Sequence, residues 1–166
     1  MHVQFLGAHN LESQDTKYIS LLIDDVLALE AGALASSLTF AAQQQLRAVL
    51  LTHRHYDHVR DIPALGMNFL LHENTLDVYT TKTVYEFLAA DLLNDRIYPN
   101  FIAKPPEKPA IRLKVLEPNQ AEQIGGYQVL AVPVNHCVPT VGYQVTSADG
   151  KTLFYTGDTG PGLEEC

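Results

Sequence analysis

The sequence predicts an α/β fold in which mixed sheets are flanked by helices. Strand-like segments come first, an apolar strand alternates with helical stretches in the middle, and from residue 111 the pattern is purely strand-like. The chain of 166 residues has the size of one domain, large enough to bury about two thirds of its unfolded surface. We therefore expect a single domain over residues 1–166.

The first half of the chain alternates short apolar runs with helical signals. Thr39 is a helix-capping residue type, and we expect a helix from this residue to Gln45. A second helix is expected after Asp57, with Pro63 close to its first turn, where proline is tolerated. The expected strands of this half span residues 2–6, 18–23, 26–30, 46–52 and 76–80.

The second half begins with a helical stripe and continues as strands. Residues 81–94 carry apolar side chains at helical spacing, which indicates a face packed on the sheet. The proline-rich segment 104–109 cannot continue a helix or a central strand, so we expect a surface connection. The expected strands span residues 111–116, 127–134, 141–147 and 152–156, and the Asp-Gly pair at 149–150 joins the last two as a hairpin.

Composition and charge exclude several classes of protein. Hydrophobic residues make up 46% of the chain and charged residues 18%, as in soluble proteins, and no apolar run is long enough to span a bilayer. The start of the chain lacks the features of a secretory signal, and two cysteines, Cys137 and Cys166, give no disulfide framework. We therefore expect a cytoplasmic protein without a membrane partner. The net charge of −8 argues against binding of long nucleic acid.

The most informative segment is His53–His58, which places three imidazoles and a carboxylate directly after an apolar strand. Imidazole and carboxylate are ligands of zinc, manganese and iron, and a site for two ions needs several of them close together. In extended backbone, side chains two residues apart point the same way, so His53 and His55 can converge on one ion. After a turn into helix, Asp57 and His58 can address a neighbouring ion.

Two further segments complete a pattern that resembles the metallo-β-lactamase superfamily of binuclear metallohydrolases. One is the run 134–143, Val-Asn-His-Cys-Val-Pro-Thr-Val-Gly-Tyr, and the other is the turn 155–160, Tyr-Thr-Gly-Asp-Thr-Gly. The resemblance covers nearly the whole chain. It implies an αββα sandwich that binds two divalent metal ions, with zinc as the expected species and manganese or iron as alternatives.

The resemblance also divides six residues between the two ions. His53, His55 and His136 would hold the first ion, Asp57 and His58 would hold the second, and Asp158 would bridge them. An aspartate can do this because its two oxygens can span ions about 3.5–4 Å apart. Asp57 would also be the catalytic residue that orients a metal-activated hydroxide. Glu30 stands where the family often has an acidic residue behind the histidines, although an ordinary strand-end glutamate fits the sequence equally well.

The segment around His136 is most similar to the phosphodiesterase branch of the superfamily, which includes ribonuclease Z and some cyclic-nucleotide phosphodiesterases. Pro139-Thr140 and Gly142-Tyr143 match the Pro-Ser-like pair and the Gly-Tyr of that branch. Ribonuclease Z usually carries a long arm for tRNA between this histidine and the bridging aspartate, whereas only 21 residues separate His136 from Asp158. The resemblance therefore favours a phosphodiesterase that acts on a small-molecule phosphodiester, such as a small or cyclic nucleotide.

One ligand of the family has no counterpart in this sequence. The family's last metal ligand is a histidine well downstream of the bridging aspartate, and the sequence ends at Cys166. We expect that these residues belong to a longer protein, so that the domain is incomplete at its C-terminus; the alternatives are that the second site is weak or that a neighbouring chain of a homo-oligomer completes it. Two other functions stay open, namely a thioester or lactone hydrolase on the same fold and a non-catalytic metal-binding module. The sequence does not identify the general acid; His9 is conceivable in this role, but a structural or surface role fits that histidine better.

Overall fold

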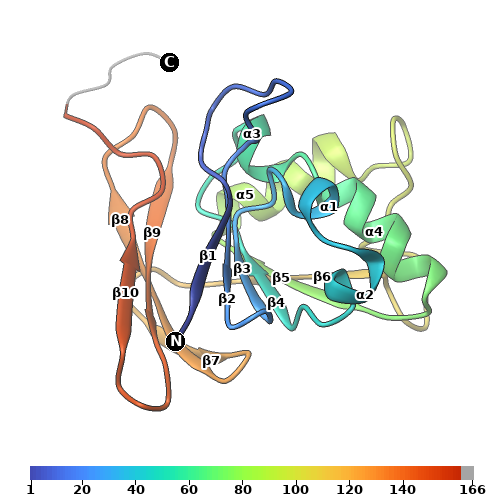
Figure 1. The fold of residues 1–166 in the computed structure, drawn as a ribbon. Coiled ribbons are helices and arrows are strands. Elements are labelled where there is room, and N and C mark those ends of the chain that lie inside the picture. Colours follow the sequence, from blue (N-terminus) through green and yellow to red (C-terminus); the bar gives the residue numbers. More distant parts are fainter. Residues whose placement is uncertain (162–166) are drawn as a thin grey trace.

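A computed structural model describes residues 1–161, which form two β-sheets and a layer of helices (Figure 1). The first sheet contains six strands, ordered in space as they follow along the chain. They are β1 (Val3–Gly7), β2 (Ser20–Ile23), β3 (Leu27–Leu29), β4 (Ala48–Leu50), β5 (Leu76–Thr80) and β6 (Ile111–Val115). Strands β1 to β3 pair antiparallel and β3 to β6 pair parallel. The parallel strands β3 and β4 are buried along their whole length, as is usual where both faces of a sheet are covered.

The second sheet is antiparallel and has the spatial order β10-β9-β8-β7. Its strands are β7 (Ala121–Ile124), β8 (Tyr127–Val134), β9 (Thr140–Thr146) and β10 (Thr152–Tyr155). Along β8, the side chains of Tyr127, Val129 and Ala131 are buried, whereas Gln128 between them is exposed. This alternation shows that one face of the second sheet packs against the rest of the protein.

Helices cover the face of the first sheet that lies opposite to β8–β10 (Figure 1). They are α1 (Leu34–Ser37), α2 (Phe40–Gln43), α3 (Tyr56–Val59), α4 (Ile62–Leu71), α5 (Lys82–Phe87) and the π-helical turn η1 (Leu88–Leu92). Thr39 caps α2, because its hydroxyl accepts a hydrogen bond from the amide of Ala42 at 3.2 Å. Over residues 1–161, no helix has the length and apolar character needed to cross a membrane.

Two apolar cores hold the three layers together. Along β4, Val49 faces the helices, in a core with Phe69 and Phe101, whereas Leu50 faces the second sheet, in a core with Tyr143. All of these side chains are buried. Burial on both faces therefore fixes β4 at the centre of the molecule, and the residues that follow β4 inherit this fixed position.

The predicted fold class is confirmed, because mixed sheets pack face to face with helices outside. Every predicted strand is present, with ends that differ by a few residues. Within the described residues, helices cover the first sheet only, so three of the four layers of an αββα sandwich are described. Cys166, part of the argument for a reducing compartment, lies outside the described residues.

Several details differ from the expectations, and α1 was not predicted. The helix expected after Asp57 begins before that residue, at Tyr56, and is divided into α3 and α4 at Arg60–Asp61. The helix expected over 81–94 consists of α5 followed by η1. Strand β7 was not predicted, because its segment Ala121–Ile124 has two exposed polar residues in its middle and little apolar character.

Candidate metal centre

Strand β4 and helix α3 together position the predicted histidine cluster. His53 follows the buried strand and is itself buried, and His55 is the residue that precedes the first turn of α3. The backbone of the β3–α1 loop holds α3 in place, since the Ala31 amide donates to the His58 carbonyl at 2.7 Å and the Asp61 amide donates to the Ala31 carbonyl at 2.7 Å. These two bonds fix the C-terminal part of the short helix.

The turns that follow β8 and β10 bring the remaining predicted residues to the same end of the molecule (Figure 1). Asn135 joins the two turns, because its side-chain amide donates to the Gly160 carbonyl at 2.6 Å and its own carbonyl accepts from the Gly160 amide at 3.0 Å. The Thr159 hydroxyl also donates to the Asn135 carbonyl at 3.0 Å. These bonds flank His136 on one segment and Asp158 on the other, so they set the separation of the two side chains.

Three imidazole nitrogens and a carboxylate converge beside β4. Nδ1 of His55 lies 3.0 Å from Nε2 of His53 and 3.3 Å from Nε2 of His136. One ligand atom each from His53, His55, His136 and Asp158 lies within 4.8 Å of the others. Imidazole nitrogens and a carboxylate oxygen gathered in this way are donors that can hold a divalent metal ion.

A second group of side chains adjoins the first and shares Asp158 with it. Nε2 of His58 lies 3.6 Å from Oδ2 of Asp57 and 3.4 Å from Oδ1 of Asp158. The other carboxylate oxygen of Asp158, Oδ2, lies 4.0 Å from Nε2 of His136. Asp158 therefore presents one oxygen to each group, and all six predicted site residues lie together.

A buried carboxylate supports both groups from behind. Oε1 of Glu30 accepts a hydrogen bond from the Thr52 hydroxyl at 2.6 Å and lies 3.2 Å from Nδ1 of His58. Because the Thr52 hydrogen is donated to Glu30, the Thr52 oxygen accepts from Nδ1 of His53, 2.9 Å away. This assignment leaves Nε2 of His53 without a proton and directed at the other imidazoles, which is the tautomer that a metal ligand needs.

Burial and charge set the protonation of the cluster. Burial lowers the pKa of His53 to about 2, so its imidazole is neutral. Burial also opposes the charged form of His58, but the carboxylates of Glu30 and Asp158 outweigh it and raise the pKa of His58 to about 10. The hydrogen bond from His58 in turn lowers the pKa of Asp158 to about 2. This part of the site therefore attracts positive charge, and together with the unprotonated nitrogen of His53 it fits divalent cations.

Two glycines permit the close backbone approaches that the site needs. A Cβ atom on Gly32 would lie 2.0 Å from the carbonyl oxygen of Asp57. A Cβ atom on Gly157 would lie 3.0 Å from Cγ2 and Oγ1 of Thr52, and Gly157 has a φ of 62°, which side-chain-bearing residues rarely adopt. Glu30 itself has a φ of 65°, an uncommon conformation for a residue other than glycine.

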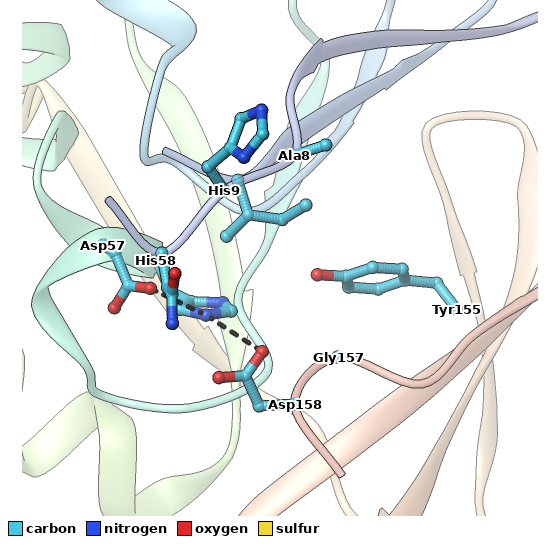
Figure 2. A pocket seen from close by; sticks show the side chains of 9 residues that line it. Ala8, His9, Asp57, His58, Tyr155, Gly157 and Asp158 are labelled. Atoms are coloured by element: carbon cyan, nitrogen blue, oxygen red, sulfur yellow. Dashed lines mark ion pairs between the residues drawn. The ribbon is translucent and has the colours of Figure 1, made fainter. Parts of the chain in front are cut away.

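A pocket of about 350 Å³ opens onto the second group (Figure 2). Its lining residues come from the β1–β2 loop, α3 and the end of β10: Ala8, His9, Asn10, Ile19, Asp57, His58, Tyr155, Gly157 and Asp158. The exposed His9 lies at this pocket, as the sequence allowed. Thr52 and Tyr155 were not predicted as site residues, although each is close in sequence to one that was.

The fold and the site define a class of protein: two face-to-face sheets that carry a histidine and aspartate cluster, suited to divalent metal, at one end. The chain belongs to the family described as the beta-lactamase superfamily domain, whose model matches residues 20–165. This agrees with the resemblance inferred from the motifs.

Individual relatives of known sequence agree with this family. The chain is 26% identical over 114 residues to ribonuclease Z of Acaryochloris marina, which covers 68% of this chain and 34% of that protein. It is 32% identical over 114 residues to ribonuclease Z of Pyrococcus abyssi, with 66% and 34% covered. The chain thus spans about a third of the length of these curated relatives.

Solved structures share the fold at low sequence identity. The metallo-beta-lactamase fold protein YhfI from Bacillus subtilis matches with a TM-score of 0.76 and 22% identity, over 94% of this chain and 61% of that one. Unliganded yeast PDE1 matches with a TM-score of 0.80 and 14% identity, over 94% of this chain and 64% of that one. At these identities, the likeness supports the fold.

Proposed function

We propose that the protein is a metal-dependent phosphodiesterase that acts on small or cyclic nucleotides. The observation that carries the proposal is the position of Asp158, whose Oδ1 faces His58 at 3.4 Å while Oδ2 faces His136 at 4.0 Å. A carboxylate shared between two groups of ligands is the arrangement that two adjacent metal ions require. Zinc is the species that the donor set favours, and manganese and iron are the alternatives.

Some residues of the site would bind the metal ions, and others orient the metal ligands or the attacking water molecule. His53, His55 and His136 would hold the first ion, Asp57 and His58 would hold the second, and Asp158 would serve both. A pair of divalent ions supplies a nucleophile at neutral pH and neutralises charge on phosphoryl oxygens. Asp57 lines the pocket, so its carboxylate can accept a hydrogen bond from an attacking water molecule and orient it. Glu30 and Thr52 keep the imidazoles of His58 and His53 in the required orientation.

Phosphodiesters are favoured over other esters by the relatives and by the motif after His136. The curated relatives include ribonuclease Z from several organisms, and ribonucleases cleave phosphodiester bonds. The Pro139-Thr140 and Gly142-Tyr143 pairs also match the phosphodiesterase branch.

RNA is the second candidate substrate, because it is what a ribonuclease acts on. Two observations favour a small substrate instead. The chain carries a net charge of −8, which opposes binding to a long polyanion. A short hairpin turn, in which the Gly150 amide donates to the Ser147 carbonyl at 2.9 Å, joins β9 to β10, where the resemblance to ribonuclease Z would place an arm.

The experiment is an assay of zinc-loaded protein against four kinds of substrate. These are bis-p-nitrophenyl phosphate, 3′,5′-cyclic AMP, an RNA with a 3′ extension, and a thioester. We expect turnover of the first two, and the variant Asp158→Asn should abolish it while the protein remains folded. Cleavage of RNA alone would replace the small substrate by the second candidate, and cleavage of the thioester alone would replace phosphodiesters altogether.

Metal analysis separates an enzyme from a non-catalytic module. About two ions per chain are expected for a shared carboxylate between two groups of ligands. About one ion per chain, without turnover of any substrate, would favour the non-catalytic metal-binding module. Repeating the analysis across protein concentrations tests whether a homo-oligomer completes the second site, because metal content would then rise with association.

A further inference from the structure

Tyr155 occupies a position in the pocket that the proposed chemistry does not yet use. It is the last residue of β10, three residues before Asp158, and it lines the same pocket as Asp57, His58 and Asp158. Figure 2 shows its hydroxyl at the end of the ring nearest His58, directed into the pocket. A phenol in this position can contact a molecule bound beside Asp158.

The neighbouring tyrosine on the same pair of strands has a different role. Tyr143 of β9 lies directly opposite Tyr155 in the strand register. It is fully buried, and its hydroxyl donates a hydrogen bond to the carbonyl of Leu51 at 2.8 Å. The hydroxyl of Tyr143 thus serves the fold between the two sheets, whereas that of Tyr155 faces the pocket.

The surroundings of Tyr155 keep its hydroxyl protonated. Burial raises the pKa of Tyr155, and the negative charges of Glu30 and Asp158 and a hydrogen bond from the phenol toward Glu30 raise it further, so a bound phosphoryl oxygen would compete with Glu30 for this proton. The hydroxyl is therefore a hydrogen-bond donor over the whole working range of pH.

An uncharged hydrogen-bond donor at this place can bind a phosphodiester substrate in a pocket that also contains carboxylates. The pocket wall carries two carboxylates, Asp57 and Asp158, which repel the negative oxygens of a phosphate group. Metal ions offset that repulsion on one side. A phenol in the same lining can hold a phosphoryl oxygen without adding a charge that would compete for the metal ligands.

From this geometry we propose that Tyr155 is a substrate-binding residue whose hydroxyl donates a hydrogen bond to a nonbridging oxygen of the phosphoryl group. The inference deepens the proposed function and rests on it for the identity of the substrate. It adds a contact that is independent of the six metal ligands.

The test measures binding of inorganic phosphate to the zinc-loaded protein by titration calorimetry, which needs no turnover. Tyr155→Phe removes only the hydroxyl and should weaken phosphate binding about 10-fold, the effect expected for a hydrogen bond to a charged group. Tyr143→Phe is the matched control, because it removes a hydroxyl from the opposite strand without touching the pocket. It should lower the melting temperature and leave phosphate affinity within about 2-fold of the original protein.

Several results would overturn the proposal. Equal phosphate affinity in Tyr155→Phe and the original protein would exclude the contact, as would an original protein that binds zinc but no phosphate. A Tyr155→Phe variant that loses zinc, yet binds phosphate normally once zinc is saturated, would show that the hydroxyl supports Glu30 instead. If no phosphodiester is cleaved but phosphate binding falls as expected in Tyr155→Phe, the proposed function fails and the contact stands.

Discussion

Glu30 and His58 form a buried ion pair on the side of the imidazole that faces away from the pocket. Oε1 of Glu30 lies 3.2 Å from Nδ1 of His58, while Nε2 of the same ring faces Asp57 and Asp158. The same carboxylate oxygen accepts from the Thr52 hydroxyl, which contacts His53. One buried oxygen therefore orients a ligand of each proposed metal ion.

Replacing Glu30 by glutamine should weaken metal binding at both positions. Oε1 serves the Thr52 hydroxyl and His58, and Oε2 accepts from the Thr52 amide at 3.3 Å, so an NH₂ group at either place meets another donor. We expect zinc affinity to fall about 10–100-fold, the usual effect of removing a partner behind a ligand. Competition with a chelator measures this. Glu107→Gln, at an exposed position, is the control, and equal zinc affinity in the two variants would show that Glu30 does not support the site.

Thr52 should matter through its hydroxyl alone. Thr52→Val keeps the branched shape but leaves Nδ1 of His53 without an acceptor, and we expect about a 10-fold loss of zinc affinity. Thr52→Ser retains the hydroxyl and should bind zinc nearly as the original protein does. Because Thr52 and Glu30 belong to one hydrogen-bond network, the double variant Glu30→Gln with Thr52→Val should lose less than the sum of the two single losses. Strict additivity would contradict the network.

The part of the site that lies within one short segment could be predicted from sequence, because strand and helix periodicity determine where its side chains point. His53 and His55 follow a buried strand, and Asp57 and His58 lie on the next helix, so four of the six residues lie within one short segment. His136 and Asp158 were placed with them by the family resemblance. Their proximity depends on the packing of one sheet against the other, which no local pattern encodes.

The supporting residues were harder to predict for the same reason. Glu30 could not be distinguished from an ordinary strand-end glutamate, because its partner Thr52 is 22 residues away and the contact depends on the register between β3 and β4. The burial of Phe101 in the core was equally hard to predict, because this residue lies in an irregular segment and yet is fully buried against α4. Residues that are far apart in sequence meet through tertiary packing. The periodicity of the sequence does not reveal such contacts.

Gly32 should tolerate no side chain, because α3 is held against it. In Gly32→Ala, the new Cβ would lie 2.0 Å from the Asp57 carbonyl oxygen and 2.7 Å from the Ile19 carbonyl oxygen, so backbone must move. We expect a loss of at least about 2 kcal/mol in the free energy of unfolding and a loss of zinc binding. Gly150→Ala is the comparison, because its Cβ meets no atom within 4 Å and only the φ of 80° opposes it. That variant should lose about 1 kcal/mol and keep its zinc.

Phe101 should stabilise the fold without contributing to the site. Its ring packs on Gly66 of α4, where a Cβ atom would lie 2.3 Å from the ring carbon Cδ2, so the two residues are in tight contact. Phe101→Ala should lower the free energy of unfolding by about 3–5 kcal/mol, as for other buried aromatic residues. Urea unfolding measures the loss. Zinc content of the folded variant should equal that of the original protein, and a parallel fall in zinc would mean that the α4 core controls the metal ligands.

Removal of metal should leave the sheets intact, because the two apolar cores contain none of the proposed ligands. In the metal-free state, the His58 imidazolium lies between Glu30 on one side and Asp57 and Asp158 on the other, and it offsets part of their repulsion. We expect the far-ultraviolet circular dichroism of chelator-treated protein to match that of zinc-loaded protein. The melting temperature should fall on chelation, and the fall should grow with the zinc concentration of the loaded sample. When free zinc is a thousand times its dissociation constant, bound zinc adds about 4 kcal/mol to the free energy of unfolding. Loss of the dichroism spectrum on chelation would instead make the metal a structural requirement of the fold, as it is in small zinc domains.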